Sequence, residues 1–204
     1  MKKVTLVLAM ILSLGVSYAQ DNTWEQVELK SGETNPDAKY LTGAVPEVNG
    51  KVVFEKLIRV PSKTKKQIYD ILLSQFTKMT KEANQFEQSR IAYNDTLDNK
   101  QLVASYQEWL VFKNKPLVLD RTRLFYQLIA DIKDGEVLIK MNRIYYLYDE
   151  ERTPTTYQAE EWITDRYGLN RKMTKLARVS GKFRRKTIDR KDYIFGRLEK
   201  ELLK

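Results

Sequence analysis

The side chains best suited to acid–base or metal chemistry gather in one acidic stretch. It contains six carboxylates within seventeen residues: Asp149, Glu150, Glu151, Glu160, Glu161 and Asp165. Two carboxylates about 5 to 9 Å apart across a cleft could hydrolyse a glycoside. The same oxygens could instead hold a hard cation such as Ca²⁺, although the chain has no Asp-rich calcium-loop motif. Ion pairing with the basic C-terminal segment is a third interpretation, and the sequence leaves all three open.

Other catalytic chemistry is limited by two absences. The chain has no Cys and no His, which excludes thiolate nucleophiles, disulfides, Ser-His-Asp triads and His-based zinc motifs. Ser62 to Lys65 has the spacing of a serine–lysine hydrolase motif, but the accompanying S-D-N and K-T-G elements are missing. We therefore interpret Ser62 as a helix N-cap. No catalytic residue, cofactor-binding motif or metal-binding motif is predicted.

The C-terminal segment is strongly basic. From Arg166 to Lys204 there are 14 Lys and Arg against 4 Asp and Glu. Six cations fall within ten residues: Lys182, Arg184, Arg185, Lys186, Arg190 and Lys191. We expect an amphipathic helix whose basic face points outward, toward an anionic partner such as lipid headgroups or an acidic glycan. The alternative is a structural role, with some cations turned toward the acidic stretch.

A second candidate surface comes from alternation along two predicted strands. Residues 122–132 place Leu124, Tyr126 and Leu128 on one side, and residues 137–148 place Val137, Ile139, Met141, Tyr145 and Leu147 on one side. The other side would carry Phe125, Ile129, Ile144, Tyr146 and Tyr148. Exposed apolar patches mark partner sites, so this face is a candidate binding surface unless a helix or the N-terminal leader covers it.

These candidates sit on an expected α+β framework. A strand is predicted over 52–60, a helix over 63–81 with Leu72 and Phe76 buried, and strands over 90–94, 102–112, 122–132 and 137–148. A short helix over 159–167 and a final helix after Gly181 follow. The turn residues and alternation indicate a two-layer sandwich: an antiparallel sheet of about five strands with helices on one face.

The N-terminus has the features of a secretory signal peptide. Lys2 and Lys3 precede an apolar run from Val4 to Val16, and Ser17 and Ala19 are small residues before a cut ahead of Gln20. We divide the chain into a signal peptide (1–19), a polar leader (20–39) and a single domain (40–204). The mature chain would have no transmembrane segment and would be periplasmic or secreted.

Several strings in the chain are specific to one family. They are Lys51–Phe54, Asp120–Arg123, Tyr145–Tyr148 with Glu150 and Glu151, Ala159–Asp165 and Gly181–Asp189. These strings resemble a Bacteroidota family designated domain of unknown function 4468, over roughly Tyr40 to Leu203. The resemblance implies an exported protein with a fold like that of the TATA-binding protein (TBP). It implies no activity and no site residues.

Taken together, these features predict an exported, non-catalytic binding module of the cell envelope. Its partner would be an envelope protein, a glycan or an anionic surface. We expect no nucleic-acid partner, because an exported chain rarely meets the chromosome. The alternative is a carboxylate-dependent hydrolase acting on an envelope or extracellular glycan.

Overall fold

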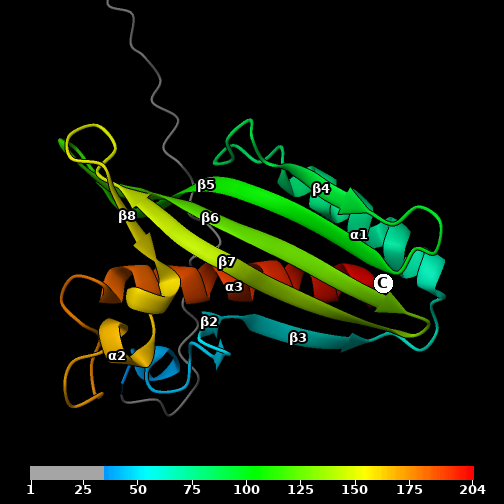
Figure 1. The fold of residues 1–204 in the computed structure, drawn as a ribbon, viewed down its shortest axis with the longest axis horizontal. Coiled ribbons are helices and arrows are strands. Elements are labelled where there is room, and N and C mark those ends of the chain that lie inside the picture. The colour runs from blue at the N-terminus through cyan, green and yellow to red at the C-terminus, as the bar shows by residue number, and fades with distance from the viewer. Residues whose placement is uncertain (1–34) are drawn as a thin grey trace, which may run out of the picture.

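The computed structural model describes residues 35–204, which form a six-stranded antiparallel sheet with two long helices on one face (Figure 1). The predicted signal peptide and most of the predicted leader lie outside the described residues. In chain order the elements are η2 (Ala38–Tyr40), β1 (Glu47–Val48), β2 (Lys51–Val52), β3 (Phe54–Arg59), α1 (Lys65–Met79), β4 (Arg90–Asn94), β5 (Gln101–Lys115), β6 (Val118–Lys133), β7 (Glu136–Tyr148), β8 (Thr155–Gln158), η3 (Ala159–Glu161), α2 (Asp165–Gly168) and α3 (Gly181–Leu202).

Strand order in the sheet is β3-β7-β6-β5-β4, and β8 also pairs with β7. Strands β5, β6 and β7 form a continuous meander, and Gly135 takes the positive φ (73°) that the tight turn from β6 to β7 requires. Strand β3 pairs with the first half of β7 and β8 with its last four residues. The predicted α+β sandwich is confirmed, with β8 as a sixth strand beyond the five expected.

Helix α1 begins two residues later than the sequence suggested. Its N-cap is Thr64, whose hydroxyl accepts a hydrogen bond from the Gln67 backbone amide, while the Gln67 side chain accepts one from the Thr64 amide. This reciprocal capping box satisfies two backbone donors, which a Ser62 cap would not do. Leu72 and Phe76 are completely buried between α1 and the sheet, as predicted.

The face assignment within β7 differs from the simple alternation. Phe125 pairs with Tyr145 but Gln127 pairs with Asn142, so β7 carries one extra residue there, and Arg143 has a positive φ of 51°. A bulge of this kind shifts the side-chain parity of the strand by one. Ile144 and Tyr146 are therefore fully buried under the helices, and Tyr148 packs on Phe183. The prediction that these three lie on the exposed face is wrong.

Arg184 ties the start of α3 to three other segments. Its guanidinium donates hydrogen bonds to the backbone carbonyls of Tyr40 (2.6 Å), Leu41 (2.6 Å) and Ile163 (2.7 Å), and to a carboxylate oxygen of Asp165 (2.7 Å). A fully buried charge needs such a complete set of partners, because an unpaired one costs many kcal/mol. The interaction fixes η2 and the segment before α2 against α3.

Arg190 forms the second buried anchor of α3. Its Nε and Nη2 atoms donate to both carboxylate oxygens of Glu108 at 2.7 Å, and Nη2 also reaches Glu82 at 3.0 Å. Glu108 is 0% exposed and also accepts hydrogen bonds from the side-chain amides of Asn84 and Gln85. Burial alone would lower the pKa of Arg190, but the Glu108 charge raises it above its ordinary value.

The predicted outward basic face of α3 is therefore wrong. Besides the two buried arginines, Lys182 pairs with Asp120, Arg185 with Asp37 and Lys191 with Asp192. Lys186 is half-buried. The structural alternative holds for α3 because carboxylates distant in sequence surround it: Asp37, Glu82, Glu108, Asp120 and Asp165.

Phe76 is expected to contribute strongly to stability. Replacing it with Ala should lower the free energy of unfolding by about 3–5 kcal/mol, because the whole side chain is buried. Urea unfolding followed by circular dichroism measures the change. Ser74→Ala on the exposed side of α1 is the matched control and should change stability by less than about 0.5 kcal/mol. A loss below about 1 kcal/mol for Phe76→Ala would contradict the described packing.

Arg190→Met tests the buried ion pair. The substitution leaves the Glu108 charge without its bidentate partner and should destabilise the protein by about 3–5 kcal/mol. Adding Glu108→Gln should recover part of that loss, because no uncompensated charge then remains in the core. Lys200→Met, at an exposed position of the same helix, is the control. If the double variant is no more stable than Arg190→Met, the loss reflects packing rather than charge.

Candidate binding surface

One face of the sheet carries no helix among the described residues. Helices α1 and α3 pack on the other face, and the view in Figure 1 looks directly onto this uncovered one. We call it the open face. Its side chains come from alternating positions of the strands: Leu57, Tyr93, Val103, Ser105, Gln107, Trp109, Arg121, Arg123, Phe125, Gln127, Ile129, Asp131, Leu138, Lys140, Asn142, Tyr145 and Leu147.

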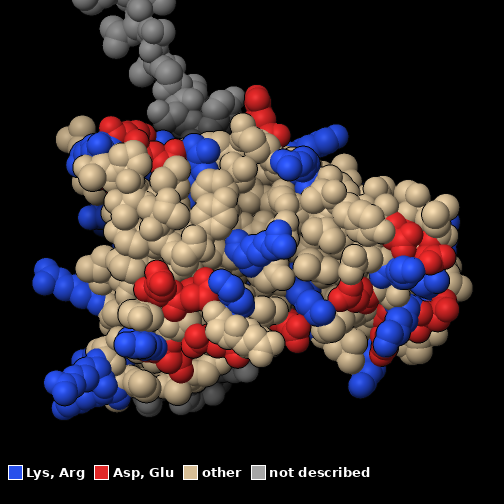
Figure 2. Space-filling model, in the orientation of Figure 1, with Lys and Arg blue, Asp and Glu red and all other residues tan. Residues whose placement is uncertain are grey.

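The open face is mixed in chemistry but apolar over much of its area. In Figure 2 uncharged side chains cover much of this face, and basic side chains also lie in its middle. Large hydrophobic side chains remain accessible at both margins: Leu57 on β3 is 46% exposed and Tyr93 on β4 is 51% exposed. Two of the predicted face residues, Phe125 and Ile129, do lie here, partly exposed between these margins.

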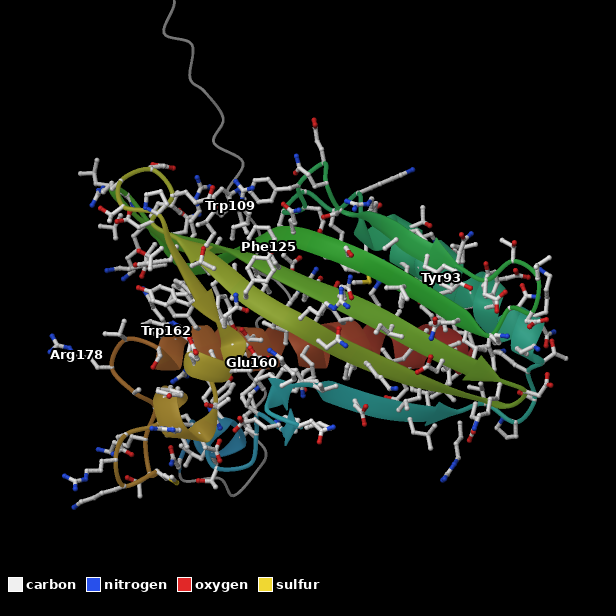
Figure 3. The ribbon with its side chains drawn as sticks, viewed as in Figure 1. Tyr93, Trp109, Phe125, Glu160, Trp162 and Arg178 are labelled. Atoms are coloured by element: carbon white, nitrogen blue, oxygen red, sulfur yellow. The ribbon has the colours of Figure 1, made fainter. Side chains whose placement is uncertain are left out.

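Aromatic rings and arginines form a connected group at one end of the open face, where Figure 3 labels Trp109 and Phe125. Phe86, from the loop before β4, packs on Trp109 with ring centroids 5.0 Å apart, and Phe125 stacks on Tyr145 at 4.3 Å. The guanidinium of Arg121 lies 3.7 Å from the Trp109 centroid. We name these residues the aromatic–arginine cluster: Phe86, Trp109, Arg121, Arg123, Phe125 and Tyr145.

The cluster is held in place by carboxylates that follow β7. Arg123 donates to both oxygens of Glu150 (2.8 and 2.6 Å) and lies 4.0 Å above the Phe86 ring, while Arg121 pairs with Glu151 at 3.2 Å. Bidentate Arg–carboxylate pairs fix the plane of the guanidinium. Burial raises the pKa of the Tyr145 hydroxyl above its ordinary value. The result is a rigid platform of rings and guanidinium planes.

The six carboxylates of the acidic stretch do not meet in one place. Glu150 and Glu151 pair with the cluster arginines, and Asp165 pairs with Arg184. Glu160 instead accepts a hydrogen bond from the Val52 amide, and Glu161 is exposed. Within residues 35–204 no group of three or more acidic side chains is arranged to hold a metal ion.

The cavity nearest these carboxylates is lined by acidic side chains that already form ion pairs or hydrogen bonds. It measures about 260 Å³ and is lined by Trp109, Asp120, Asp149, Glu150 and Glu151, among others. Asp120 accepts hydrogen bonds from the Tyr148 hydroxyl and from Lys182, and Glu150 from Arg123. Both carboxylates are therefore already engaged by cations of the protein, and their oxygens are not directed at an open cleft as the glycosidase mechanism requires. This geometry favours a structural role for the acidic stretch.

Sequence reasoning missed most of the open face. Trp109 and Tyr145 belong to it, and alternation through Val103, Ser105 and Gln107 could have located Trp109. The bulge that puts Tyr145 there was signalled only by Arg143, which broke the apolar pattern of the strand. Beside the bulge lies a second cavity of about 470 Å³, lined by Lys51 of β2, by β7 and by Gln158 of β8, and the side-chain oxygen of Asn142 is buried without a hydrogen-bond partner.

Comparisons with known proteins agree with this architecture. A crystal structure of a DUF4468 family protein from Bacteroides ovatus is 40% identical, with a TM-score of 0.75 over 81% of this chain and 94% of that one. A TBP-like protein from Parabacteroides distasonis is 19% identical, with a TM-score of 0.61 over 78% and 96% of the two chains, and shows the fold alone. No curated protein matches the chain.

The family profile described as a domain of unknown function with TBP-like fold matches residues 54–147, from β3 through most of β7. These residues contain α1 and the strands that build the open face. Together with the 40% identity to the Bacteroides ovatus protein over four fifths of the chain, the match establishes that this chain belongs to the DUF4468 family and has its TBP-like fold.

Proposed function

We propose that the chain is an exported, non-catalytic module of the cell envelope that binds a partner protein through the open face of its sheet. The observation that carries this proposal is the open face itself. It is a broad sheet surface with accessible Leu57 and Tyr93 at its margins and the aromatic–arginine cluster at one end. Uncovered apolar area of this kind marks interaction sites on soluble proteins.

A protein partner fits the composition of this surface. Aromatic residues and Arg are enriched at the centres of protein interfaces, and Trp, Tyr and Arg carry much of the binding free energy. The rings and guanidinium groups of the cluster are already ordered by stacking and ion pairs. A preordered surface loses little side-chain entropy on binding. The face is also broad rather than deeply hollowed, which suits a macromolecule better than a small substrate.

The hydrolase alternative has less support. It requires two carboxylates across a cleft, one of them protonated. Glu150 and Asp120, which line the cavity beside Trp109, each face a cation instead.

Paired surface variants test the binding role. Leu57→Ser with Tyr93→Ser removes apolar area from the open face, whereas Leu97→Ser with Leu203→Ser removes exposed apolar area elsewhere. After crosslinking in native envelopes, the first pair should lower recovery of a specific partner by about tenfold or more. The second pair should leave it unchanged. If both folded double variants recover the same amount of partner, the open face is not the binding surface.

Export is tested separately. If residues 1–19 are a signal peptide, intact-mass analysis of the envelope fraction should show a chain beginning at or close to Gln20. Recovery of the uncleaved chain from the cytoplasm would contradict export without affecting the proposed role of the open face.

A further inference from the structure

Two loops lie at the same end of the long axis of the molecule, at its upper and lower corners in Figure 1. One is the tip of the β5–β6 hairpin, residues 113–119. The other is the α2–α3 segment, residues 166–179. We call these two segments together the loop end. Each of them presents exposed cations together with large hydrophobic side chains.

The cations of the loop end are not neutralised by the protein. Five exposed ones lie in the α2–α3 segment: Arg166, Arg171, Lys172, Lys175 and Arg178. Lys113 and Lys115 are added by the hairpin. Within residues 35–204 none of the seven has an ion-pair partner, and the sequence contains no carboxylate between Asp165 and Asp189. Figure 2 shows Lys and Arg projecting at the lower corner of this end, with Asp and Glu at its upper corner, and Figure 3 shows Arg178 pointing away from the body.

Large hydrophobic side chains are exposed in the same two segments. Leu117 is fully exposed, with Val118 and Leu119 beside it, and Met173 and Val179 are about half exposed. Leu117 and Met173 also have positive φ angles of 65° and 53°. Bulky residues rarely adopt this backbone conformation, which favours Gly or Asn. Leu117 and Met173 therefore each expose a large apolar side chain to solvent at the apex of a loop. Their backbone conformation is one that Asn adopts more readily than Leu or Met.

We propose that the loop end docks the protein onto an anionic lipid bilayer. Lys and Arg near an anionic membrane surface gain attraction from the headgroup phosphates. Apolar side chains between them can enter the boundary between headgroups and acyl chains. This inference goes beyond the proposed partner binding, because it uses a different surface and a different ligand.

A bilayer fits the loop end better than a soluble polyanion does. A polyanion would be bound by the cations alone and would gain nothing from Leu117, Met173 or Val179 at the apices. Docking, not spanning, is the expected mode, because among residues 35–204 no helix is both long and apolar enough to cross a membrane.

The test uses the chain starting at Gln20, so that the apolar N-terminal run cannot bind vesicles itself. Sedimentation with phosphatidylglycerol-containing vesicles at low salt should recover the protein, and pure phosphatidylcholine vesicles should not. Binding should weaken at high salt, because screening shortens the range of the attraction. Failure to bind the anionic vesicles at low salt would overturn the proposal.

Charge variants test whether binding depends on the cations of the loop end or only on the net charge of the protein. Changing Arg171, Lys172, Lys175 and Arg178 to Gln should weaken vesicle binding by up to about fivefold per cation. The matched control changes Arg59, Lys78, Lys81 and Lys200 to Gln, which removes the same charge from exposed positions elsewhere. Equal weakening by both sets would show that only net charge matters, and would overturn the proposal.

Replacing the apolar side chains tests whether the loop end binds a bilayer or a soluble polyanion. Leu117→Asn with Met173→Asn should weaken vesicle binding and leave heparin binding unchanged. Because Asn suits positive φ, the same pair should keep or slightly raise the thermal midpoint, so a loss of vesicle binding could not be attributed to unfolding. Unchanged vesicle binding in this pair, with heparin bound equally well, would identify a polyanion site instead of a membrane one.

Discussion

The buried contact between Arg190 and Glu108 is the constraint on which the arrangement of helices and sheet depends. Glu108 lies in β5 and points toward the helical layer, so one half of an ion pair lies in the core. Burying such a charge is unfavourable without a partner of opposite charge and further hydrogen bonds. Arg190 supplies the charge, and the amides of Asn84 and Gln85 supply the rest. Helix α3 can therefore pack only in the register that brings Arg190 over Glu108.

This register places the rest of α3 as well. Arg184, less than two turns earlier, then reaches the carbonyl groups of Tyr40, Leu41 and Ile163. Phe183 packs among Tyr146, Tyr148 and Trp162 with ring centroids 5.1 to 5.8 Å apart. Most of the basic residues in the helix thus pair with carboxylates of other segments. The cations of the segment before the helix are exposed and, within residues 35–204, form no ion pair.

The sequence carried enough information for the architecture but not for the surfaces. Alternation in β6 and the turn at Asp134 and Gly135 predicted the meander, because both are local properties. The bulge at Arg143 is not local: it depends on the pairing of β7 with β6, and it reversed the placement of Ile144 and Tyr146. The partners of Arg184 and Arg190 lie up to 144 residues away in the chain, so a count of charges within the helix could not reveal them.

The two proposed surfaces adjoin near the tip of the β5–β6 hairpin, where Leu119 and Trp109 line one cavity. The loop end lies at one end of the long axis, whereas the open face runs along that axis and faces the viewer in Figure 1. A molecule standing on a bilayer by its loop end would hold the open face roughly perpendicular to the membrane, where a neighbouring protein could reach it. The sheet meander explains how one fold provides both surfaces. The β5–β6 hairpin extends past the helical layer to form an apex at Leu117, and the same two strands carry Trp109, Arg123 and Phe125 on the open face.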